Sequence, residues 1–361
     1  CARHGCRLTG HMMMEESIYS QMTGTGGNMP FYAHMDMPGV DSLRRYVHDP
    51  RIPKQVGSVA EQLGRHDVIS ESFAMSGWDL NFEEMRWIAG WQFVNGVNRI
   101  CPHLQAYSLR GMRKRDYPPS LFYQQSWWDE YSRFNDCLAR LSMVVTEGEK
   151  RVDILMIHPM RSGWVSYDGQ NNERIRKIDA DFVRACTALS GLHMDYHFGD
   201  EGLMKQYASL DGSILRVGKG AYRAVVLPSL ISIDPETLEL LLSFAEAGGT
   251  IVGYGDFPPL CAGRPDKRLE QLRGVTRFAA SEQELLRLLS PVLAAPISIA
   301  ENGSQIHDIA CCQRETAEGR ILYLINLSRE NTHHAEITLS GVRTVEELLL
   351  DTAEAKPVFV W

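Results

Sequence analysis

Acidic, imidazole and indole side chains gather in the first third of the chain, at or just after short runs of strand-forming residues. Glu71 is the most informative of them, because it lies in the run VISESF (68–73) among apolar or small neighbours. An unpaired carboxylate in such a setting is costly unless hydrogen bonds or a functional site offset the burial. A carboxylate near Trp and His suits glycoside hydrolysis, since charge develops at the anomeric carbon and aromatic faces stack on sugar rings. The alternative is a structural ion pair with Arg or Lys.

A second carboxylate is expected from Glu16 or its neighbour Glu15, which follow a strand-like run. Adjacent acids are equally typical of a helix N-terminus, where they interact favourably with the helix dipole. The other side chains that we expect to bind sugar are His11, His34, Asp36, Trp78, His103, Tyr107, Gln125, Trp127 and Trp128. For each histidine and tryptophan, a place in the hydrophobic core is the alternative.

His34, Asp36 and Asp41 lie close enough in the sequence to suggest a metal site built from hard oxygen ligands. The intervening Pro38-Gly39 equally indicates a turn, with Asp41 capping a helix over Ser42–Tyr46. We expect the capping role for Asp41 and no metal site.

Strand-like runs alternate with amphipathic helices in this part of the chain. The expected strands are Arg7–Met13, Met29–Met35, His66–Phe73 and Gly96–Leu104, and the expected helices include one capped by Asn81 and one over Ser126–Val144. Such alternation predicts parallel βα units. Because no nucleotide-binding glycine fingerprint is present, the four units favour half of a (β/α)8 barrel over a Rossmann sheet. In such a barrel the C-terminal ends of the strands face the substrate.

Two further domains are expected, so that the chain divides into a partial barrel over residues 1–148, an α/β domain over 149–272 and a β-rich domain over 273–361. The middle part alternates predicted strands such as Val152–Ile157 and Thr250–Tyr254 with helices such as Asp179–Leu189, the pattern of a doubly wound sheet of flavodoxin or class I amidotransferase type. The last part shows alternating segments, from Ile306–Gln313 to Val358–Trp361, that predict antiparallel strands.

The composition excludes several classes of protein. The 361 residues carry 37 Lys and Arg against 45 Asp and Glu, so the net charge of −8 disfavours a nucleic acid partner. No apolar run approaches the ~18 residues that span a bilayer. The eight cysteines are scattered without C-x-x-C pairs, which predicts reduced thiols and a cytoplasmic protein.

Several motifs together resemble large bacterial glycoside hydrolases of the α-L-rhamnosidase type (family 106) and, more distantly, family 42 β-galactosidases. They are TGHMMMEES (9–17), MPGVD (37–41), SESFAMSGW (70–78), PHLQAYS (102–108), RKRDYPPS (113–120) and YQQSWW (123–128). The resemblance, over about residues 1–260, implies that the four βα units are the fifth to eighth of a barrel and that Glu71 is one of two catalytic carboxylates. The rhamnosidase type implies inversion with Glu71 as general base, and calcium near the sugar hydroxyls. The galactosidase likeness implies retention with Glu71 as nucleophile.

This resemblance also implies that the second carboxylate belongs to a fourth strand that would precede Cys1, so that the chain is the C-terminal portion of a glycosidase. A half-barrel has two open edges, and we therefore expect copies of the chain to associate and the chain alone to be inactive. The partner expected of the parent enzyme is a carbohydrate substrate. The rival hypothesis is a binding or scaffold fragment without activity of its own.

A class I amidotransferase fold raises the question of glutamine hydrolysis, which needs a cysteine nucleophile at the turn after a strand. The residue there is Tyr254, and Cys186 lies on a predicted helix. Since a phenol cannot replace a thiolate in acyl transfer, the protein should release no ammonia from glutamine. Ammonia release that ends when one cysteine is alkylated would contradict this prediction.

Overall fold

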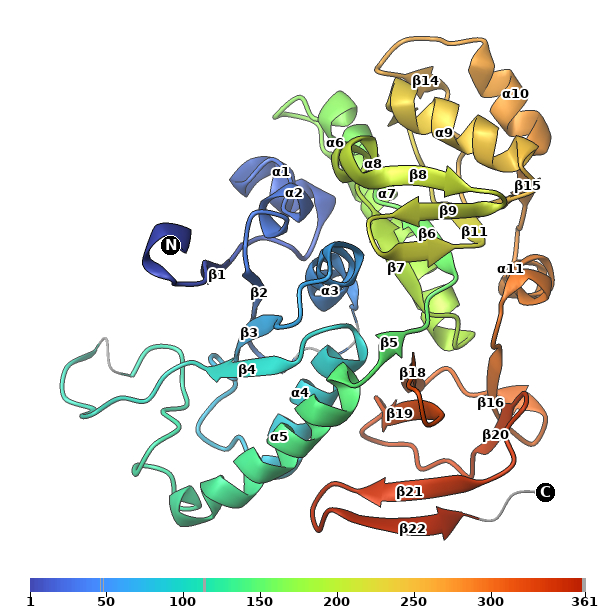
Figure 1. The fold of residues 1–361 in the computed structure, drawn as a ribbon. Helices are drawn as coiled ribbons and strands as arrows, with labels where there is room; N and C mark the ends of the chain where they lie inside the picture. The colour runs from blue at the N-terminus through green and yellow to red at the C-terminus, as the bar shows by residue number, and fades with distance from the viewer. Residues whose placement is uncertain (46, 48, 113–114, 359–361) are drawn as a thin grey trace.

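The computed structural model describes residues 1–358 apart from 46, 48, 113 and 114 (Figure 1). Its first part contains a four-stranded parallel sheet in the order of the chain. The strands are β1 (Thr9–His11), β2 (Met37–Ser42), β3 (Ile69–Ser72) and β4 (Arg99–Pro102). The associated helices are η1 (Ala2–His4), α1 (Ile18–Gly24), α2 (Met29–Tyr32), α3 (Arg51–Leu63), α4 (Phe82–Val94), η3 (Trp128–Glu130) and α5 (Tyr131–Thr146). Four consecutive parallel strands agree with the expected βα units, and their place in a barrel stays a prediction.

The predicted strand Met29–Met35 is wrong, because this segment begins with the helix α2 and the strand follows at Met37–Ser42. Pro30 lies in the first turn of α2, where its missing amide hydrogen is not needed. Met29 and Tyr32, three residues apart, are both buried in the core, which is a helical spacing. The predicted cap is also wrong, since Asp41 lies within β2. Of the helix expected over Ser42–Tyr46, Ser42 belongs to β2 and Tyr46 lies outside the described residues.

Helix α4 follows the sequence pattern closely. The side chain of Asn81 accepts a hydrogen bond from the backbone amide of Glu84 at 2.9 Å, as an N-cap does. The periodic residues Met85, Ile88, Trp91 and Val94 are all buried. This capped helix is therefore confirmed, but it is not amphipathic in its second half, because residues 88–94 are all buried. It packs against α5 and behind the first sheet.

The second sheet is also parallel and has the order β15-β13-β11-β6-β7. Its strands are β6 (Ile154–Ile157), β7 (Tyr196–Gly199), β11 (Ala224–Leu227), β13 (Thr250–Gly253) and β15 (Arg277–Phe278). Taken in chain order, this is the 2-1-3-4-5 arrangement of flavodoxin-like sheets. The helices of this part are α6 (Met160–Ser166), α7 (Glu173–Gly191), α8 (Glu201–Tyr207), α9 (Pro235–Glu246), α10 (Arg268–Val275) and α11 (Glu282–Leu289). Strand β15 belongs to this second sheet but lies after residue 272, the position at which we predicted the boundary between the second and third domains.

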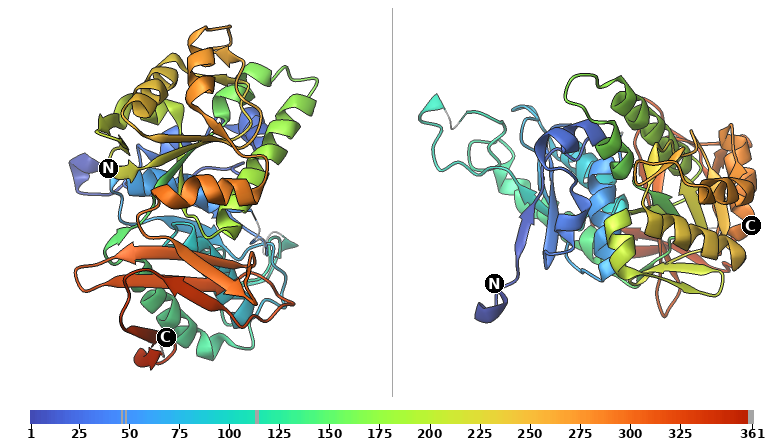
Figure 2. Two further views of the ribbon diagram at one scale, coloured as in Figure 1. Left: turned by 90° about the vertical axis from the view of Figure 1, so that its right-hand side faces the viewer. Right: turned by 90° about the horizontal axis from the view of Figure 1, so that it is seen from above.

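The remaining strands form small sheets, which are antiparallel in the last part of the chain (Figure 2). Beside the second sheet lie β8 (Ala208–Asp211), β9 (Ile214–Val217) and β10 (Gly220–Tyr222), with a parallel pair β12 (Ser232–Ile233) and β14 (Leu260–Cys261). The later strands, after η4 (Ser290–Val292), are β16 (Ile297–Glu301), β17 (Ser304–Gln305), β18 (Ile309–Glu315), β19 (Arg320–Asn326), β20 (Glu336–Leu339), β21 (Val345–Leu349) and β22 (Glu354–Val358). The expected linker at Glu147–Lys150 contains β5 (Glu149–Lys150), which pairs with β18. Residues 359–361 of the last predicted strand lie outside the described residues.

Helix α3 lies between the two parallel sheets and contacts β2 on one side and β7 on the other. Its apolar residues Val56, Val59 and Ala60 share one core with residues of both sheets. Its polar residues instead bond to the edge strand β7. The hydroxyl of Ser58 accepts from the amide of Phe198 at 2.9 Å, and the Nε2 of Gln62 donates to the carbonyl of the same residue at 3.0 Å. The helix thus supplies partners that an edge strand otherwise lacks.

A buried ion cluster lies beside these contacts. The carboxylate of Asp195 pairs with the Nζ of Lys54 from α3 at 2.5 Å and with the Nζ of Lys150 from β5 at 3.0 Å. These two positive charges hold the pKa of Asp195 well below its usual range, although burial alone would raise it. One carboxylate therefore joins helix α3 of the first part of the chain to strand β5 of the second.

Replacing Asp195 with Asn should destabilise the protein by about 3–5 kcal/mol, because two buried ammonium groups would lose their shared counter-charge. The measurement is urea-induced unfolding at pH 7. Asp211→Asn is the matched control, since Asp211 pairs with Arg216 at the surface and should change stability little. Equal stabilities of the Asp195 variant and the parent would contradict the prediction.

Among the described residues, no helix is long and apolar enough to cross a membrane.

Candidate active site

Three side chains meet at the C-terminal ends of the first three strands of the first sheet. Asp41 of β2 lies directly opposite Glu71 of β3 in the register, and His11 ends β1. The Nε2 of His11 lies 2.8 Å from the Oε2 of Glu71. One polar atom each from His11, Asp41 and Glu71 fall within 4.8 Å of one another, and all three residues are half-buried. His103, after β4, adds a fourth group, its Nε2 being 3.6 Å from the Oε1 of Glu71.

The alternation of side chains along β3 explains why Glu71 faces this cluster. Ser70 and Ser72 are buried on the opposite side of the strand, where their hydroxyls lie 3.0 Å apart. The Nε2 of Gln92 on α4 donates to the Ser72 hydroxyl at 3.2 Å. The two serines therefore attach the strand to its covering helix, and the residue between them must point to the other face.

Glu71 has histidines as ion-pair partners among the described residues, so the expected alternative of a structural pair with Arg or Lys is not found there. The Nδ1 of His11 lies 2.8 Å from the carbonyl oxygen of Met12, which can only accept, so Nδ1 carries a hydrogen. The Nε2 of the same ring is then the atom at which His11 gains or loses its proton, and this atom faces the Glu71 carboxylate.

The pKa values of two members of the cluster are shifted by their neighbours. Burial opposes the charged form of His11, but the Met12 carbonyl and the carboxylates of Glu71 and Asp41 outweigh it and raise the pKa of the imidazole. Burial and the negative charge of Glu71 raise the pKa of Asp41, against the opposing influence of the histidines. The arrangement therefore favours a protonated His11, whose Nε2 faces Glu71 and holds its side chain in place.

Glu15 and Glu16 follow this cluster on the loop between β1 and α1, and they differ in environment. Glu16, our expected second carboxylate, is exposed. Glu15 is 2% exposed, and the hydroxyl of Tyr32 donates to its Oε1 at 2.9 Å. Burial raises the pKa of Glu15 to about 7, although the hydrogen bond from Tyr32 opposes the shift. The Glu16 charge raises the pKa of Glu15 and of Asp41, so it acts on the same site.

His34 and Asp36 do not lie at the site end of the sheet. Both precede β2, and the Oδ2 of Asp36 accepts from the backbone amide of Leu8 at 2.8 Å, before β1 begins. The strand rise places Asp36 about 16 Å from Asp41. The expectation that the second strand ends in His34 and Asp36 is therefore wrong, because the strand had been placed eight residues too early. The same error gave Asp41 the expected role of a helix cap, whereas the pairing of β2 with β3 brings it beside Glu71.

The aromatic residues expected to bind sugar lie in different settings. Trp78 is 41% exposed after β3, and Tyr107 is 88% exposed. Trp127 and Trp128 stack on the ring of Tyr131 with centroid separations of 5.8 and 5.3 Å, and both pack against the core around α4 and α5. Gln125 is buried, and its Nε2 has no hydrogen-bond partner among the residues that the structure describes. Their roles in sugar binding stay predictions.

The turn after β13 carries Tyr254, over whose ring the guanidinium of Arg184 lies at 5.3 Å. Cys186 is buried in α7, and burial raises the pKa of its thiol to about 12. All eight cysteines are free thiols. A buried thiol of this pKa is a poor nucleophile, and the lack of glutamine hydrolysis stays a prediction.

The cluster of His11, Asp41 and Glu71 offers two carboxylates and one imidazole as possible ligands for a divalent cation. Two carboxylates suit calcium, which binds about six to eight oxygens, but an imidazole nitrogen does not. The residues therefore fit the calcium that the resemblance implies only in part, and at most Asp41 and Glu71 would hold it.

The fold is shared with glycoside hydrolases of known structure. The sequence pattern of glycoside hydrolase family 106, α-L-rhamnosidase, matches residues 45–340, and the chain belongs to this family. A curated protein of Formosa agariphila, provisionally named beta-glucuronidase, is 21% identical over 301 residues, which are 77% of this chain and 23% of that protein.

Solved structures show the same fold. The rhamnosidase from Novosphingobium sp. PP1Y superposes with a TM-score of 0.69 at 19% identity, over 92% of this chain and 33% of that one. An exo-carrageenase of family 42 from Bacteroides ovatus gives a TM-score of 0.57 at 12% identity, over 91% of this chain and 47% of that one. The chain thus spans about a quarter to a third of the length of the curated relative and the rhamnosidase.

The environment of Glu15 predicts a pH-dependent stability. Its pKa is raised from 4.5 to about 7 on folding, so the folded protein holds this proton more tightly and loses stability as the pH rises from 4.5 to 7. Glu15→Gln should remove that loss. At pH 8 the variant should be more stable than the parent, by roughly 3 kcal/mol at most, and at pH 4 the two should be alike.

Urea unfolding of both proteins at pH 4 and pH 8 measures this difference. Glu16→Gln is the control, because Glu16 is exposed and should show a much smaller change. If the parent and the Glu15 variant kept the same difference in stability at both pH values, the raised pKa of Glu15 would be refuted.

Proposed function

We propose that the chain provides part of the active site of an α-L-rhamnosidase-type glycoside hydrolase, with Glu71 as a catalytic carboxylate. The observation that carries the proposal is the position of Glu71. It projects from the C-terminal end of a parallel strand, between two histidines and opposite Asp41, in a chain that belongs to this family. Such strand ends form the substrate-binding face in barrel enzymes.

In this proposal Glu71 acts as the general base of an inverting reaction. Hydrogen-bonded by His11, it would accept a proton from the water that attacks the anomeric carbon. Asp41 is not the partner acid, because an oxygen of Asp41 lies within 4.8 Å of one of Glu71, closer than the roughly 6.5–9.5 Å of inverting carboxyl pairs. We assign Asp41 and His103 to hydrogen bonds with sugar hydroxyls.

Glu16 is the second carboxylate that we propose within the chain. It is exposed near the same end of the sheet, where it can meet a leaving group, and its charge acts on Asp41. Trp78, exposed beyond β3, is the proposed surface on which the sugar ring stacks. No step of the proposed mechanism passes through a metal.

A second candidate is a retaining glycosidase in which Glu71 is the nucleophile. The fold similarity to family 42 enzymes favours it, including a β-galactosidase from G. stearothermophilus with a TM-score of 0.51 at 12% identity, over 90% of this chain and 51% of that one. The two mechanisms differ in the anomer that they release. Proton NMR of the first-formed sugar therefore separates them, inversion being expected.

The substrate class is tested with aryl glycosides of α-L-rhamnose, β-D-galactose and β-D-glucuronic acid. We expect turnover of the rhamnoside by the parent enzyme, in line with the expectation that the chain alone is inactive. Turnover of the galactoside or glucuronide alone would replace the proposed substrate, and no turnover of any glycoside would overturn the proposed function.

Glu71→Gln should lower kcat by about 10²–10⁴-fold, the contribution typical of a positioned acid or base, and should change stability by less than about 2 kcal/mol. The measurement is steady-state hydrolysis of the best aryl glycoside together with urea unfolding. Glu83→Gln, at an exposed position of α4, is the control and should keep full activity. Full activity of the Glu71 variant would remove this residue from the mechanism, and a large loss of stability would favour a structural role instead.

A further inference from the structure

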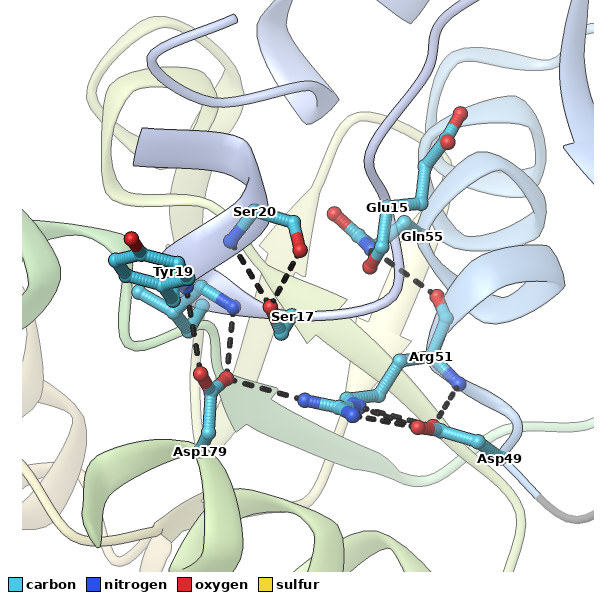
Figure 3. Close-up of polar contacts among 9 residues, drawn as sticks. Glu15, Ser17, Tyr19, Ser20, Asp49, Arg51, Gln55 and Asp179 are labelled. Atoms are coloured by element: carbon cyan, nitrogen blue, oxygen red, sulfur yellow. Dashed lines mark hydrogen bonds and ion pairs between the residues drawn. The ribbon is translucent and has the colours of Figure 1, made fainter. Parts of the chain in front are cut away.

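The loop that carries Glu15 and Glu16 is held by a residue from the second sheet's helices. Asp179 lies on α7, and its two carboxylate oxygens accept from the backbone amides of Ile18 at 2.7 Å and Tyr19 at 3.3 Å. These two residues begin α1, so their amides have no partners within the helix. The contact spans 161 residues of sequence and joins the middle part of the chain to the first (Figure 3).

Arg51, the first residue of α3, fixes the position of Asp179. Arg51 is 8% exposed, and its guanidinium lies between two carboxylates, with Nη1 3.1 Å from Asp179 and Nη2 2.5 Å from Asp49. Burial alone would lower the pKa of Arg51, but the bonds to these carboxylates raise it. Figure 3 shows Asp179 reaching from α7 toward the start of α1, with Arg51 between it and Asp49.

The same helix also holds the loop at Glu15. The Nε2 of Gln55, one turn after Arg51, donates to the backbone carbonyl of Glu15 at 3.0 Å and to that of Arg51 at 3.2 Å. Residues 12–17 run between His11 and α1. The loop is therefore attached to the site at one end, to α3 in the middle and to Asp179 at the other.

We propose that Asp179 and Arg51 are positioning residues for the active site, through which the flavodoxin-like part of the chain keeps Glu15 buried beside the catalytic cluster. This inference rests on the proposed function for its catalytic meaning. The groups that act on the Glu15 carboxyl are Tyr32 from α2, Asp41 from β2 and the adjacent Glu16. Glu15 in turn raises the pKa of His11, which contacts Glu71. Release of the loop would therefore change the charge around the catalytic carboxylate.

The test is Asp179→Ala in the protein, with the pKa of Glu15 as the first measurement. Carbon-13 NMR of the labelled glutamate carboxyl groups follows the titration, and Glu15→Gln identifies the signal. We expect the pKa of Glu15 to fall from about 7 toward its ordinary value of 4.5, because the freed loop exposes the carboxyl to water. An unchanged pKa of Glu15 in the folded variant would overturn the proposal.

Asp179→Asn is the milder variant, and it carries the test if the alanine variant fails to fold. It keeps one oxygen that can accept from an amide but loses the ion pair with Arg51, so a smaller fall of the pKa is expected. Asp181→Asn is the matched control. Asp181 lies on the same helix but bonds to Ser229 and Lys177, and its replacement should leave the pKa of Glu15 unchanged.

Hydrolysis gives the second measurement. Displacement of groups around a reacting centre costs up to about 100-fold in rate, so Asp179→Ala should lower kcat by about 10- to 100-fold. The pH dependence of kcat should shift to lower pH, as the pKa of Glu15 does. A uniform loss of activity with an unshifted pH profile would indicate only a structural role and would overturn the positioning proposal. If the parent cleaves no glycoside, the proposed function fails, whereas the NMR titration still decides whether Asp179 holds the loop.

Discussion

The polar side of helix α3 is the feature on which the remaining architecture depends. Lys54, Ser58 and Gln62 follow one another at intervals of four residues, so they form a single row along the helix. They bind the carboxylate of Asp195 and the backbone of Phe198, at the open edge of the second sheet. Because buried polar groups are costly without partners, this row matches one edge strand and few other surfaces. It thereby determines how the two parallel sheets lie relative to each other.

The opposite side of α3 supports the candidate site. Val56 and Val59 share a core with Val40 of β2, and the next residue on that strand, Asp41, consequently faces the other side of the sheet toward Glu71. The same division recurs in β3, where serines face the helix and the carboxylate faces the cluster. Helix packing and strand alternation together bring polar atoms of two acids and a histidine to within 4.8 Å of one another. His11 and His103 offset part of the electrostatic repulsion between the two acids.

Local patterns in the sequence predicted the elements that depend on neighbours in the chain. The Asn81 cap and the spacing of Met85, Ile88 and Trp91 defined α4, and the flavodoxin-like order of the second sheet agrees with its alternating strands and helices. Strand β2 was misplaced because Pro38-Gly39 has the composition of a turn. In the folded chain a Cβ at Gly39 would lie 2.7 Å from the carbonyl of Gly10, so glycine is needed there for close strand approach. Such long-range requirements, like the contact of Asp179 with α1, leave no local signal.

The charged and amide groups along α3 also bear on how such enzymes can be recombined. A chimaera that joined this first sheet to an unrelated second domain would leave Lys54 buried against a surface without acids, and Arg51 would keep Asp49 but lose Asp179. Uncompensated buried charges of this kind are strongly destabilising. A flavodoxin-like module exchanged among relatives would therefore give a stable protein only where it carries Asp179 and Asp195, or acids at equivalent places. The two modules should therefore be inherited together, because a few side chains at their boundary depend on each other.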